Sequence, residues 1–225
     1  MTRFVHLTDL HVSHPDAADA GRIPDTAGAL RKAIEIVNAM DPQPDFVVAS
    51  GDLPNLGAAP SYRLLAEILE QLQAPLIPGH VAGRIDDAGF AFLERALTRH
   101  ETVAKLIVMH HPPRIDREGL PWASIDMAST ERLAEMLAGK NIAGILSGHI
   151  HINLFSHWHG IPVVTNIGLN SSGDVLERRD LRIVEGTAMG LCDWRDSGLS
   201  VVFVPLSPAG QELGIIDRAR LEAFR

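Results

Sequence analysis

The chain has 225 residues, the length of one domain or of one domain with a short extension. Hydrophobic residues make up 46% and charged residues 21%, a balance typical of globular enzymes that excludes a disordered, collagen-like or coiled-coil chain. The formal net charge is −8, which argues against a protein that grips the backbone of a nucleic acid.

The sequence shows no targeting or membrane signal. No stretch approaches the roughly 18 consecutive apolar residues of a membrane-spanning helix. The first residues lack the charged start and long apolar run of a secretory signal. The one cysteine, Cys192, cannot form an intramolecular disulfide, so we expect a reducing compartment and a cytoplasmic protein.

Short apolar strands alternate with amphipathic helices over the first two thirds of the chain. We predict strands at residues 4–9, 46–50, 74–78, 106–109 and 142–146, and helices at 25–40, after Pro60, around 90–97 and around 133–137. The expected helix caps are Asp25, Ser61 and either Ser129 or Thr130. Such alternation favours a largely parallel sheet.

The last third is a run of strands joined by turns. Strands are predicted at residues 154–158, 161–165, 181–185, 187–192 and 199–205, and a short helix at 211–225. Both parts need a face to bury, so two packed sheets with helices outside are the economical arrangement. No linker composition divides the chain, and we expect a single domain over residues 1–225 with a short extension from about residue 206.

Polar clusters follow five of the predicted strands. They contribute aspartate and histidine side chains only: Asp9 and His11; Asp52; His80; His110 and His111; and His149 and His151. In open α/β sheets, ligands bind beyond the carboxyl ends of strands, so neighbouring strands would bring these clusters together. Each cluster alone is compatible with an ordinary turn, but their joint occurrence indicates a site for metals that accept nitrogen and carboxylate ligands.

These motifs resemble those of the calcineurin-like metallophosphoesterases, and within that superfamily those of the bacterial class III cyclic-nucleotide phosphodiesterases. The matching motifs are Ser-Gly-Asp-Leu at 50–53, Met-His-His-Pro-Pro at 109–113 and Ser-Gly-His-Ile-His at 147–151. The resemblance runs from residue 4 to about 205. It implies an α/β fold, a four-layer αββα sandwich of two mixed sheets flanked by helices, with two divalent or trivalent metal ions at the strand ends. Mn, Fe and Zn are the first candidates.

The resemblance also implies a role for each polar residue. By resemblance, one metal would be held by Asp9, His11 and His151, and the other by His110 and His149. Asp52 would bridge the two metals. A water or hydroxide bridging the two metals would then attack the phosphorus. His111 is a candidate catalytic residue that could alternatively hold a ligand in place.

One motif departs from the family pattern of Gly-Asn-His. Residues 78–84 read Pro-Gly-His-Val-Ala-Gly-Arg. Without a gap, His80 replaces the family's asparagine ligand, and the usual general acid near the leaving group is missing. With a one-residue deletion, His80 is that catalytic histidine and the asparagine is lost. The ungapped alignment keeps Arg84 in step with a common family arginine and is preferred.

The expected function is a metal-dependent phosphodiesterase that hydrolyses a small phosphate ester, either a cyclic nucleotide or a glycerophosphodiester. The altered motif keeps an alternative open, a degenerate member that binds metal or a phosphate ligand with little turnover. A dinuclear hydrolase of another bond is the third hypothesis. We expect no nucleic-acid or membrane partner, and a homodimer on the resemblance alone.

Overall fold

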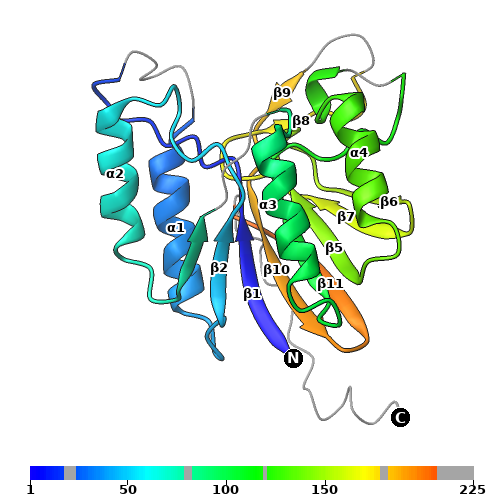
Figure 1. The fold of residues 1–225 in the computed structure, drawn as a ribbon. Helices are drawn as coiled ribbons and strands as arrows, with labels where there is room; N and C mark the ends of the chain where they lie inside the picture. Colours follow the sequence, from blue (N-terminus) through cyan, green and yellow to red (C-terminus); the bar gives the residue numbers. More distant parts are fainter. Residues whose placement is uncertain (18–23, 79–82, 119–120, 178–181, 207–225) are drawn as a thin grey trace.

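The computed structural model of the protein describes residues 1–17, 24–78, 83–118, 121–177 and 182–206. The larger of its sheets has five strands in the order β11-β10-β1-β2-β3 (Figure 1). β1, β2 and β3 are parallel, and β10 and β11 are antiparallel to their neighbours. The strands are β1 Thr2–Leu7, β2 Phe46–Ala49, β3 Leu76–Pro78, β10 Ala188–Arg195 and β11 Gly198–Pro205.

The second sheet has four strands in the order β4-β5-β7-β6, of which β6 alone runs antiparallel to its neighbour. A small two-stranded sheet, β8–β9, follows in the chain. These strands are β4 Lys105–Val108, β5 Ile142–Ser147, β6 Leu154–Trp158, β7 Ile161–Thr165, β8 Ser172–Gly173 and β9 Ile183–Val184. A 3-10 turn, Pro121–Ala123, lies between β4 and β5.

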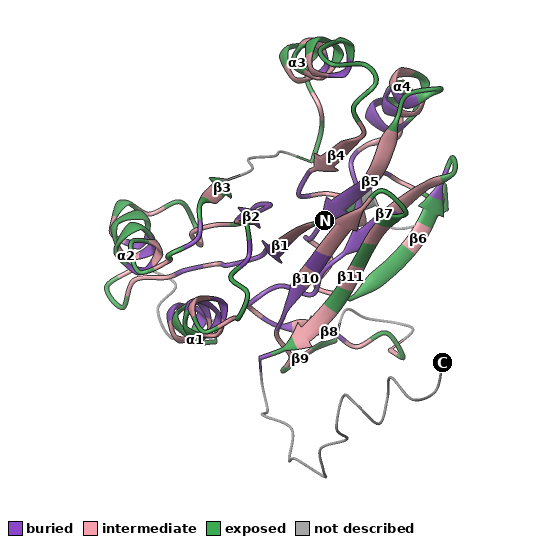
Figure 2. Cartoon of the chain, turned by 90° about the horizontal axis from the view of Figure 1, so that it is seen from below, coloured by how far each residue is buried: buried purple, intermediate pink, exposed green. Residues whose placement is uncertain are grey.

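Helices cover the outer face of each large sheet. α1 (Thr26–Asn38) and α2 (Ala59–Leu69) lie on the five-stranded sheet, and α3 (Asp87–Thr98) and α4 (Met127–Leu137) on the four-stranded one (Figure 2). Between the sheets lies a third apolar core that includes Phe4, Val48, Leu146 and Val164. Three cores separate four layers, so the predicted αββα sandwich is confirmed.

Helix starts agree with the prediction at one helix and differ at two. The Asp25 carboxylate caps α1 by accepting a 2.8 Å hydrogen bond from Gly28 N. Ser61 was predicted as a cap, but α2 begins at Ala59 because Pro60 fits the first turn of a helix, and the Ser61 hydroxyl accepts from His14 N instead.

The prediction of Ser129 or Thr130 as the cap of α4 is also wrong. Asp126 precedes the helix, and its carboxylate accepts a 2.7 Å hydrogen bond from Ser129 N. Ser129 and Thr130 therefore lie inside the first turn. A carboxylate three residues before a backbone N–H is the preferred capping arrangement, and it places the helix start earlier than the serine pattern suggested.

Remaining differences concern the strands. β8 was not predicted, and β10 continues three residues beyond the expected end at Cys192. The helix expected at 211–225 lies outside the described residues. Among the helices that the structure describes, none combines the length and apolar character needed to span a bilayer.

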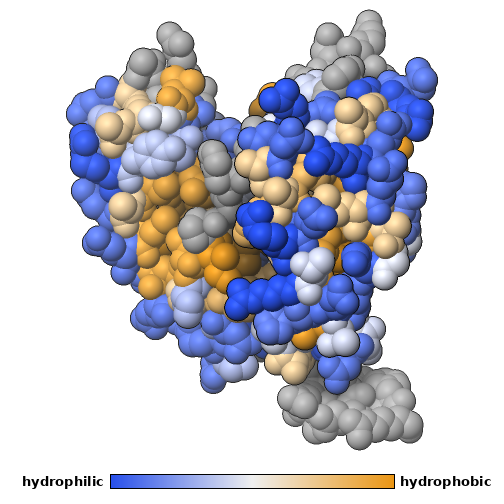
Figure 3. Space-filling view, viewed as in Figure 1, coloured by the Kyte–Doolittle hydropathy of each residue, from blue (hydrophilic) through white to orange (hydrophobic). Residues whose placement is uncertain are grey.

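The helix-bearing surface is mostly hydrophilic, whereas hydrophobic residues gather in the hollow between α2 and α3 (Figure 3). Ile77 of the edge strand β3 is 52% exposed. The hollow marks where the two helix pairs diverge.

Candidate metal centre

The predicted ligand residues that the structure describes lie together at the carboxyl ends of β1, β2, β4 and β5, the upper end of the sheets in Figure 1. Asp9 and His11 follow β1, and Asp52 follows β2, so the five-stranded sheet supplies both carboxylates. The four-stranded sheet supplies His110 after β4, and His149 and His151 after β5. Each sheet thus contributes about half of the centre.

The loops that carry these side chains are tied to one another by backbone hydrogen bonds. His11 N donates to Asp52 O at 2.7 Å, which joins the loop after β1 to the loop after β2. Gly148 N donates to His110 O at 2.9 Å and joins the corresponding loops of the other sheet. Across the two sheets, His149 N donates to both oxygens of Asp9, at 3.1 and 3.0 Å.

Three glycines allow the loops to approach the ligand side chains. A Cβ at Gly51, whose φ is +142°, would lie 2.5 Å from Cγ of His110. A Cβ at Gly168 (φ +80°) would lie 2.6 Å from Cβ of Asp9. A Cβ at Gly148 would overlap the side chains of Thr8 and Asp9. Only glycine fits such close contacts.

Three overlapping groups of potential ligand atoms form the centre. Within each group, the atoms lie within 4.8 Å of one another: Asp9, His11 and His151; Asp9, Asp52 and His110; and His110, His111 and His149. Asp9 belongs to two groups, and so does His110. Each of these groups could hold a metal ion, and the groups have ligands in common.

Both carboxylates face imidazole nitrogens. Oδ1 of Asp9 lies 3.2 Å from Nε2 of His151, 3.8 Å from that of His110 and 3.9 Å from that of His11. Oδ2 of Asp52 lies 3.2 Å from Nε2 of His110 and 3.4 Å from that of His11. Asp9 is fully buried, whereas the Asp52 side chain is 44% exposed. Asp52 therefore stands at the mouth of the centre.

Hydrogen bonds to backbone carbonyls determine which ring nitrogen of His149 and of His151 is free to bind a metal. Nδ1 of His151 lies 3.1 Å from the Ser171 carbonyl, and Nε2 of His149 lies 2.6 Å from the Trp122 carbonyl. A carbonyl only accepts, so these nitrogens carry the proton and the opposite ones carry the lone pair. His151 thus offers Nε2 and His149 offers Nδ1, as expected of oriented metal ligands.

Several buried nitrogens in the centre have no hydrogen-bond partner. They are Nε2 of His11, both ring nitrogens of His110 and Nδ1 of His111. Buried polar atoms are normally paired, and a lone pair left facing carboxylates needs a proton or a cation. The donor set of imidazoles and carboxylates without thiolate suits Zn, Mn or Fe. The residues present therefore fit metal ions.

The electrostatics of the pocket favour ionised carboxylates. The His110 imidazole, opposed by burial, holds the pKa of Asp52 well below its usual range. Burial raises the pKa of Asp9, but the nearby imidazoles of His151 and His110 outweigh burial and lower it overall. Two carboxylates that stay charged in a largely buried site attract cations.

His111 is placed against the second histidine group. Its ring centroid lies 3.7 Å from that of His149 and 5.0 Å from that of His110. Burial, reinforced by His149, lowers the pKa of His111 to about 4. Gly83 approaches the same ring. His80 lies outside the described residues, so both alignments of its motif stay open.

The structure adds residues that the sequence analysis did not single out. Asn55 Oδ1 lies 3.2 Å from Nδ1 of His11, Thr8 donates to Asp9, and Ser171 and Trp122 fix two histidines. Asn55 follows Asp52 by three residues and is polar, which is a signal that could have drawn attention. Trp122 acts through its backbone carbonyl, for which a sequence has no signature.

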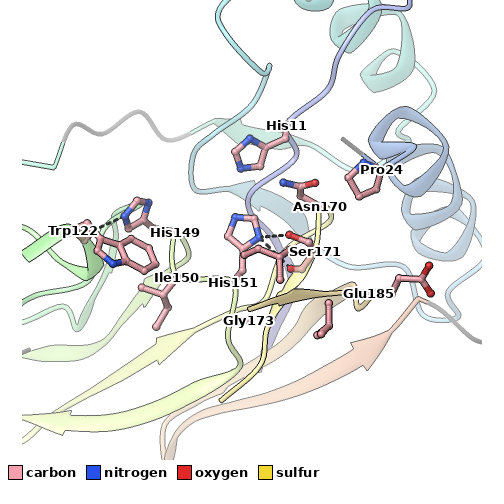
Figure 4. A pocket seen from close by; sticks show the side chains of 12 residues that line it. His11, Pro24, Trp122, His149, Ile150, His151, Asn170, Ser171, Gly173 and Glu185 are labelled. Atoms are coloured by element: carbon pink, nitrogen blue, oxygen red, sulfur yellow. Dashed lines mark hydrogen bonds between the residues drawn. The ribbon is translucent and has the colours of Figure 1, made fainter. Parts of the chain in front are cut away.

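A cavity of about 500 Å³ opens beside the centre. Figure 4 shows His11 and His151 in the middle of the lining residues, Trp122 and Ile150 on one side, and Glu185 on the other. Asn170 lies next to His11 in this view. Substrate-sized molecules could reach the ligand cluster from this cavity.

Comparison with known proteins defines the class of this domain. Residues 2–83 match the family model of the calcineurin-like phosphoesterases, and this segment contains Asp9, His11 and Asp52. The chain contains a calcineurin-like metallophosphoesterase domain, with a fold of two mixed sheets and four described helices that agrees with this class.

Its curated relatives are bacterial and distant in sequence. The chain is 24% identical over 208 residues to the "Probable cyclic nucleotide phosphodiesterase" of Rhodococcus erythropolis, covering 71% of this chain and 68% of the relative. It is 22% identical over 209 residues to the "Probable glycerophosphodiester phosphodiesterase GpdQ" of Arcobacter nitrofigilis, covering 72% and 76%.

Among solved structures, the fold resembles a purple acid phosphatase from yellow lupin seeds. The TM-score is 0.64 at 11% identity, with 93% of this chain and 52% of that one covered. At this identity the likeness concerns the fold alone.

Proposed function

We propose that the protein is a metal-dependent phosphodiesterase that hydrolyses a small phosphate ester of the cyclic-nucleotide or glycerophosphodiester class. The observation that carries this proposal is the position of Asp52, because its Oδ2 lies 3.4 Å from Nε2 of His11 on one side and 3.2 Å from Nε2 of His110 on the other. A carboxylate between two ligand groups suits two neighbouring ions. The names of the bacterial relatives support the two substrate classes.

The residues divide between two proposed metal positions. Asp9, His11 and His151 would hold one ion, and His110 and His149 the other, with Asp52 shared. Bound metal ions polarise phosphoryl oxygens and lower the pKa of coordinated water, which supplies a nucleophile near neutral pH. Asp9 and Asp52 remain charged and offset the charge of the ions.

The surrounding residues keep the ligands in position. The carbonyls of Trp122 and Ser171 hold the protons of His149 and His151 away from the centre. We assign His111 a role as a polar contact for the departing alcohol, because its buried Nδ1 has no partner and its ring packs on His149. His80 stays proposed as a ligand in place of the family's asparagine.

The test is hydrolysis of bis(p-nitrophenyl) phosphate by the protein loaded with Mn²⁺. We expect turnover in the parent and a loss of about a hundredfold or more in kcat/KM in Asp52→Ala. The matched control is Asp196→Ala, because Asp196 is an exposed aspartate in the β10–β11 turn at the opposite end of the sheet. Its activity should equal that of the parent.

Either of two results would contradict the proposal. Full activity in Asp52→Ala would remove Asp52 from the metal centre. No activity in a folded, Mn²⁺-loaded parent would favour the alternative of a phosphate-binding member without turnover. We further propose a cytoplasmic location, which suits the buried free thiol of Cys192, and a homodimer as the assembly.

A further inference from the structure

A second cavity, of about 290 Å³, lies on the helix-bearing face of the four-stranded sheet. β6 and β7 supply one wall of it. Leu154 is paired with Thr165 and Ser156 with Val163, so these four side chains point to the same face of the sheet. Val163 packs in one core with residues of α3 and α4, which identifies that face as the outer one. The cavity is therefore separate from the one beside the metal centre.

The cavity contains a buried hydroxyl among apolar groups. Ser124 lines it and is 8% exposed, and within the part of the chain that the structure describes its Oγ has no hydrogen-bond partner. The aliphatic side chains of Ile115 and Leu154 are exposed at the same cavity. A buried hydroxyl without a partner is unfavourable. A ligand that combines an apolar body with one hydrogen-bonding group would satisfy both features.

The charged groups at the cavity favour a neutral ligand. Arg114 and Asp116 both line it, so their opposite charges offset each other. Nε and Nη2 of Arg114 donate to the backbone carbonyls of Asp116 and Arg117, at 3.3 and 3.1 Å, and are thus directed at their own loop. A hydroxyl both donates and accepts hydrogen bonds, as Ser124 does. These contacts favour a neutral alcohol or phenol over an anion.

The cavity shares a wall with the metal centre. Ile150 lines this cavity and also the one beside the metal centre, and it stands between His149 and His151 in the chain. Trp122 lines the cavity beside the metal centre, and Ser124 lines this one. The Trp122 carbonyl accepts a 2.6 Å hydrogen bond from Nε2 of His149 (Figure 4). A ligand held by Ser124 and Ile150 would therefore restrain the two segments that orient His149.

We propose that this cavity is an effector site for a small neutral alcohol or phenol, and that its occupancy strengthens metal binding at the neighbouring centre. The apolar body packs on Leu154 and Ile150, and the hydroxyl pairs with Ser124. A cavity of about 150 Å³ suffices for benzene. A volume of about 290 Å³ therefore accepts a substituted six-membered ring. The link to metal binding rests on the proposed metal centre, whereas binding of the alcohol does not.

The test follows binding by fluorine NMR with two probes of similar size. 4-Fluorophenol carries the hydroxyl, and 4-fluorotoluene has a methyl group in its place. We expect the metal-free parent to bind both probes, because both bring an apolar ring into the cavity. The ratio of the two dissociation constants then measures the contact of the hydroxyl, independently of turnover and of metal.

Variants locate the contacts. Ser124→Ala should lower the preference for 4-fluorophenol over 4-fluorotoluene by about fivefold, because the hydroxyl loses its partner. The matched control is Ser197→Ala, an exposed serine of the β10–β11 turn, which should keep the parent preference. Leu154→Ser should weaken both probes several-fold by removing apolar wall. Val202→Ser, an exposed aliphatic residue of β11 outside the cavity, should weaken neither.

The link to the metal centre is measured by repeating the titration with Zn²⁺ bound. Zn²⁺ has a filled d shell and leaves the fluorine signal intact. We expect 4-fluorophenol to bind about threefold or more tightly to the Zn²⁺-loaded parent than to the metal-free parent. Because coupling between two sites is reciprocal, 4-fluorophenol should raise the affinity for Zn²⁺ by the same factor, measured by competition with a chromophoric chelator.

The outcomes separate this inference from the proposed function. An unchanged preference in Ser124→Ala, or no binding of 4-fluorophenol to the parent, would overturn the site. Equal affinities for 4-fluorophenol with and without bound Zn²⁺ would overturn its role as an effector site and leave the phosphodiesterase proposal in place. Failure of Zn²⁺ to bind would count against the metal centre, while the metal-free titration would still decide whether the cavity binds a phenol.

Discussion

Five residues of the metal centre have left-handed backbone conformations, which side-chain-bearing residues seldom adopt. Their φ angles lie between +43° and +73°: Asp9, His11, Asp52, His149 and His151. They are five of the eight such non-glycine residues in the described part of the chain. Each such conformation costs about 1–3 kcal/mol and persists only where neighbours enforce it. The loops therefore hold the ligands in position at the expense of stability.

At the same scale, we predict that tight metal binding requires glycine at position 148. Gly148→Ala would place a methyl group against Thr8 and Asp9, so the Asp9 carboxylate or its loop must shift. We expect Mn²⁺ affinity to fall by about tenfold or more, because ligand geometry at a metal tolerates little displacement. Calorimetric titration of the folded variant with Mn²⁺ measures this.

Gly160→Ala supplies the control for that change. Gly160 also has a positive φ, +81°, but a Cβ there meets nothing within 4 Å. This variant should lose some stability and bind Mn²⁺ like the parent. Equal Mn²⁺ affinity in the two variants would contradict the role given to Gly148.

Secondary-structure elements were predictable where their pattern was long. α1, with its cap at Asp25, and the strands β6 and β7 lie where periodicity placed them. β8 was missed because a two-residue strand has no periodicity to detect. Caps were misassigned at α2 and α4 because a proline and an aspartate, rather than the nearby serines, set the helix starts.

The cap of α1 carries a prediction at this scale. Asp25→Ala removes the carboxylate that accepts from Gly28 N, and we expect the free energy of unfolding to fall by about 1 kcal/mol. Asp25→Asn keeps a side-chain acceptor and should stay within a few tenths of a kcal/mol of the parent. Urea denaturation of the three proteins compares them. A loss of equal size in Asp25→Asn would show that charge, not capping, matters.

The ligand residues of the candidate site could be predicted from the sequence, but the residues that orient them could not. Strand-end aspartates and histidines carry the signal, and the structure gathers seven of the eight, all those that it describes. The residues that orient them were not predictable, because Trp122 and Ser171 act through backbone carbonyls. Asn170 gave no signal either, because the cavity that it lines is built from segments far apart in the chain.

At the scale of the whole molecule, the interior between the two sheets contains a histidine. His6 is fully buried and its Nε2 lies 2.8 Å from the Ser50 hydroxyl. Asn166, which follows β7 of the other sheet, donates to the His6 carbonyl at 3.2 Å. Burial lowers the pKa of His6 to about 4. The packed sheets therefore require this ring to be neutral.

This burial predicts a dependence of stability on pH. His6 has its usual pKa near 6.5 when unfolded, so between pH 6.5 and 4 the unfolded chain binds a proton that the folded protein excludes. Its contribution is full above pH 6.5 and is lost as the pH falls towards 4. In urea titrations, the parent should lose about 3 kcal/mol more than His6→Gln over this range. If the free energies of unfolding of the parent and of His6→Gln changed equally with pH, the neutral state assigned to buried His6 would be wrong.

The seam between the two sheets has one consequence of a different kind. Because Asp9, His11 and Asp52 come from one sheet and His110, His149 and His151 from the other, any ion they hold in common fastens the two halves of the sandwich to each other. Metal binding and folding are then thermodynamically linked. Because the ion binds only the folded protein, the free energy of unfolding would rise with the concentration of free metal ion. Bound metal would therefore stabilise the packing of the two sheets against each other, and the stability of the protein would depend on how much metal is available.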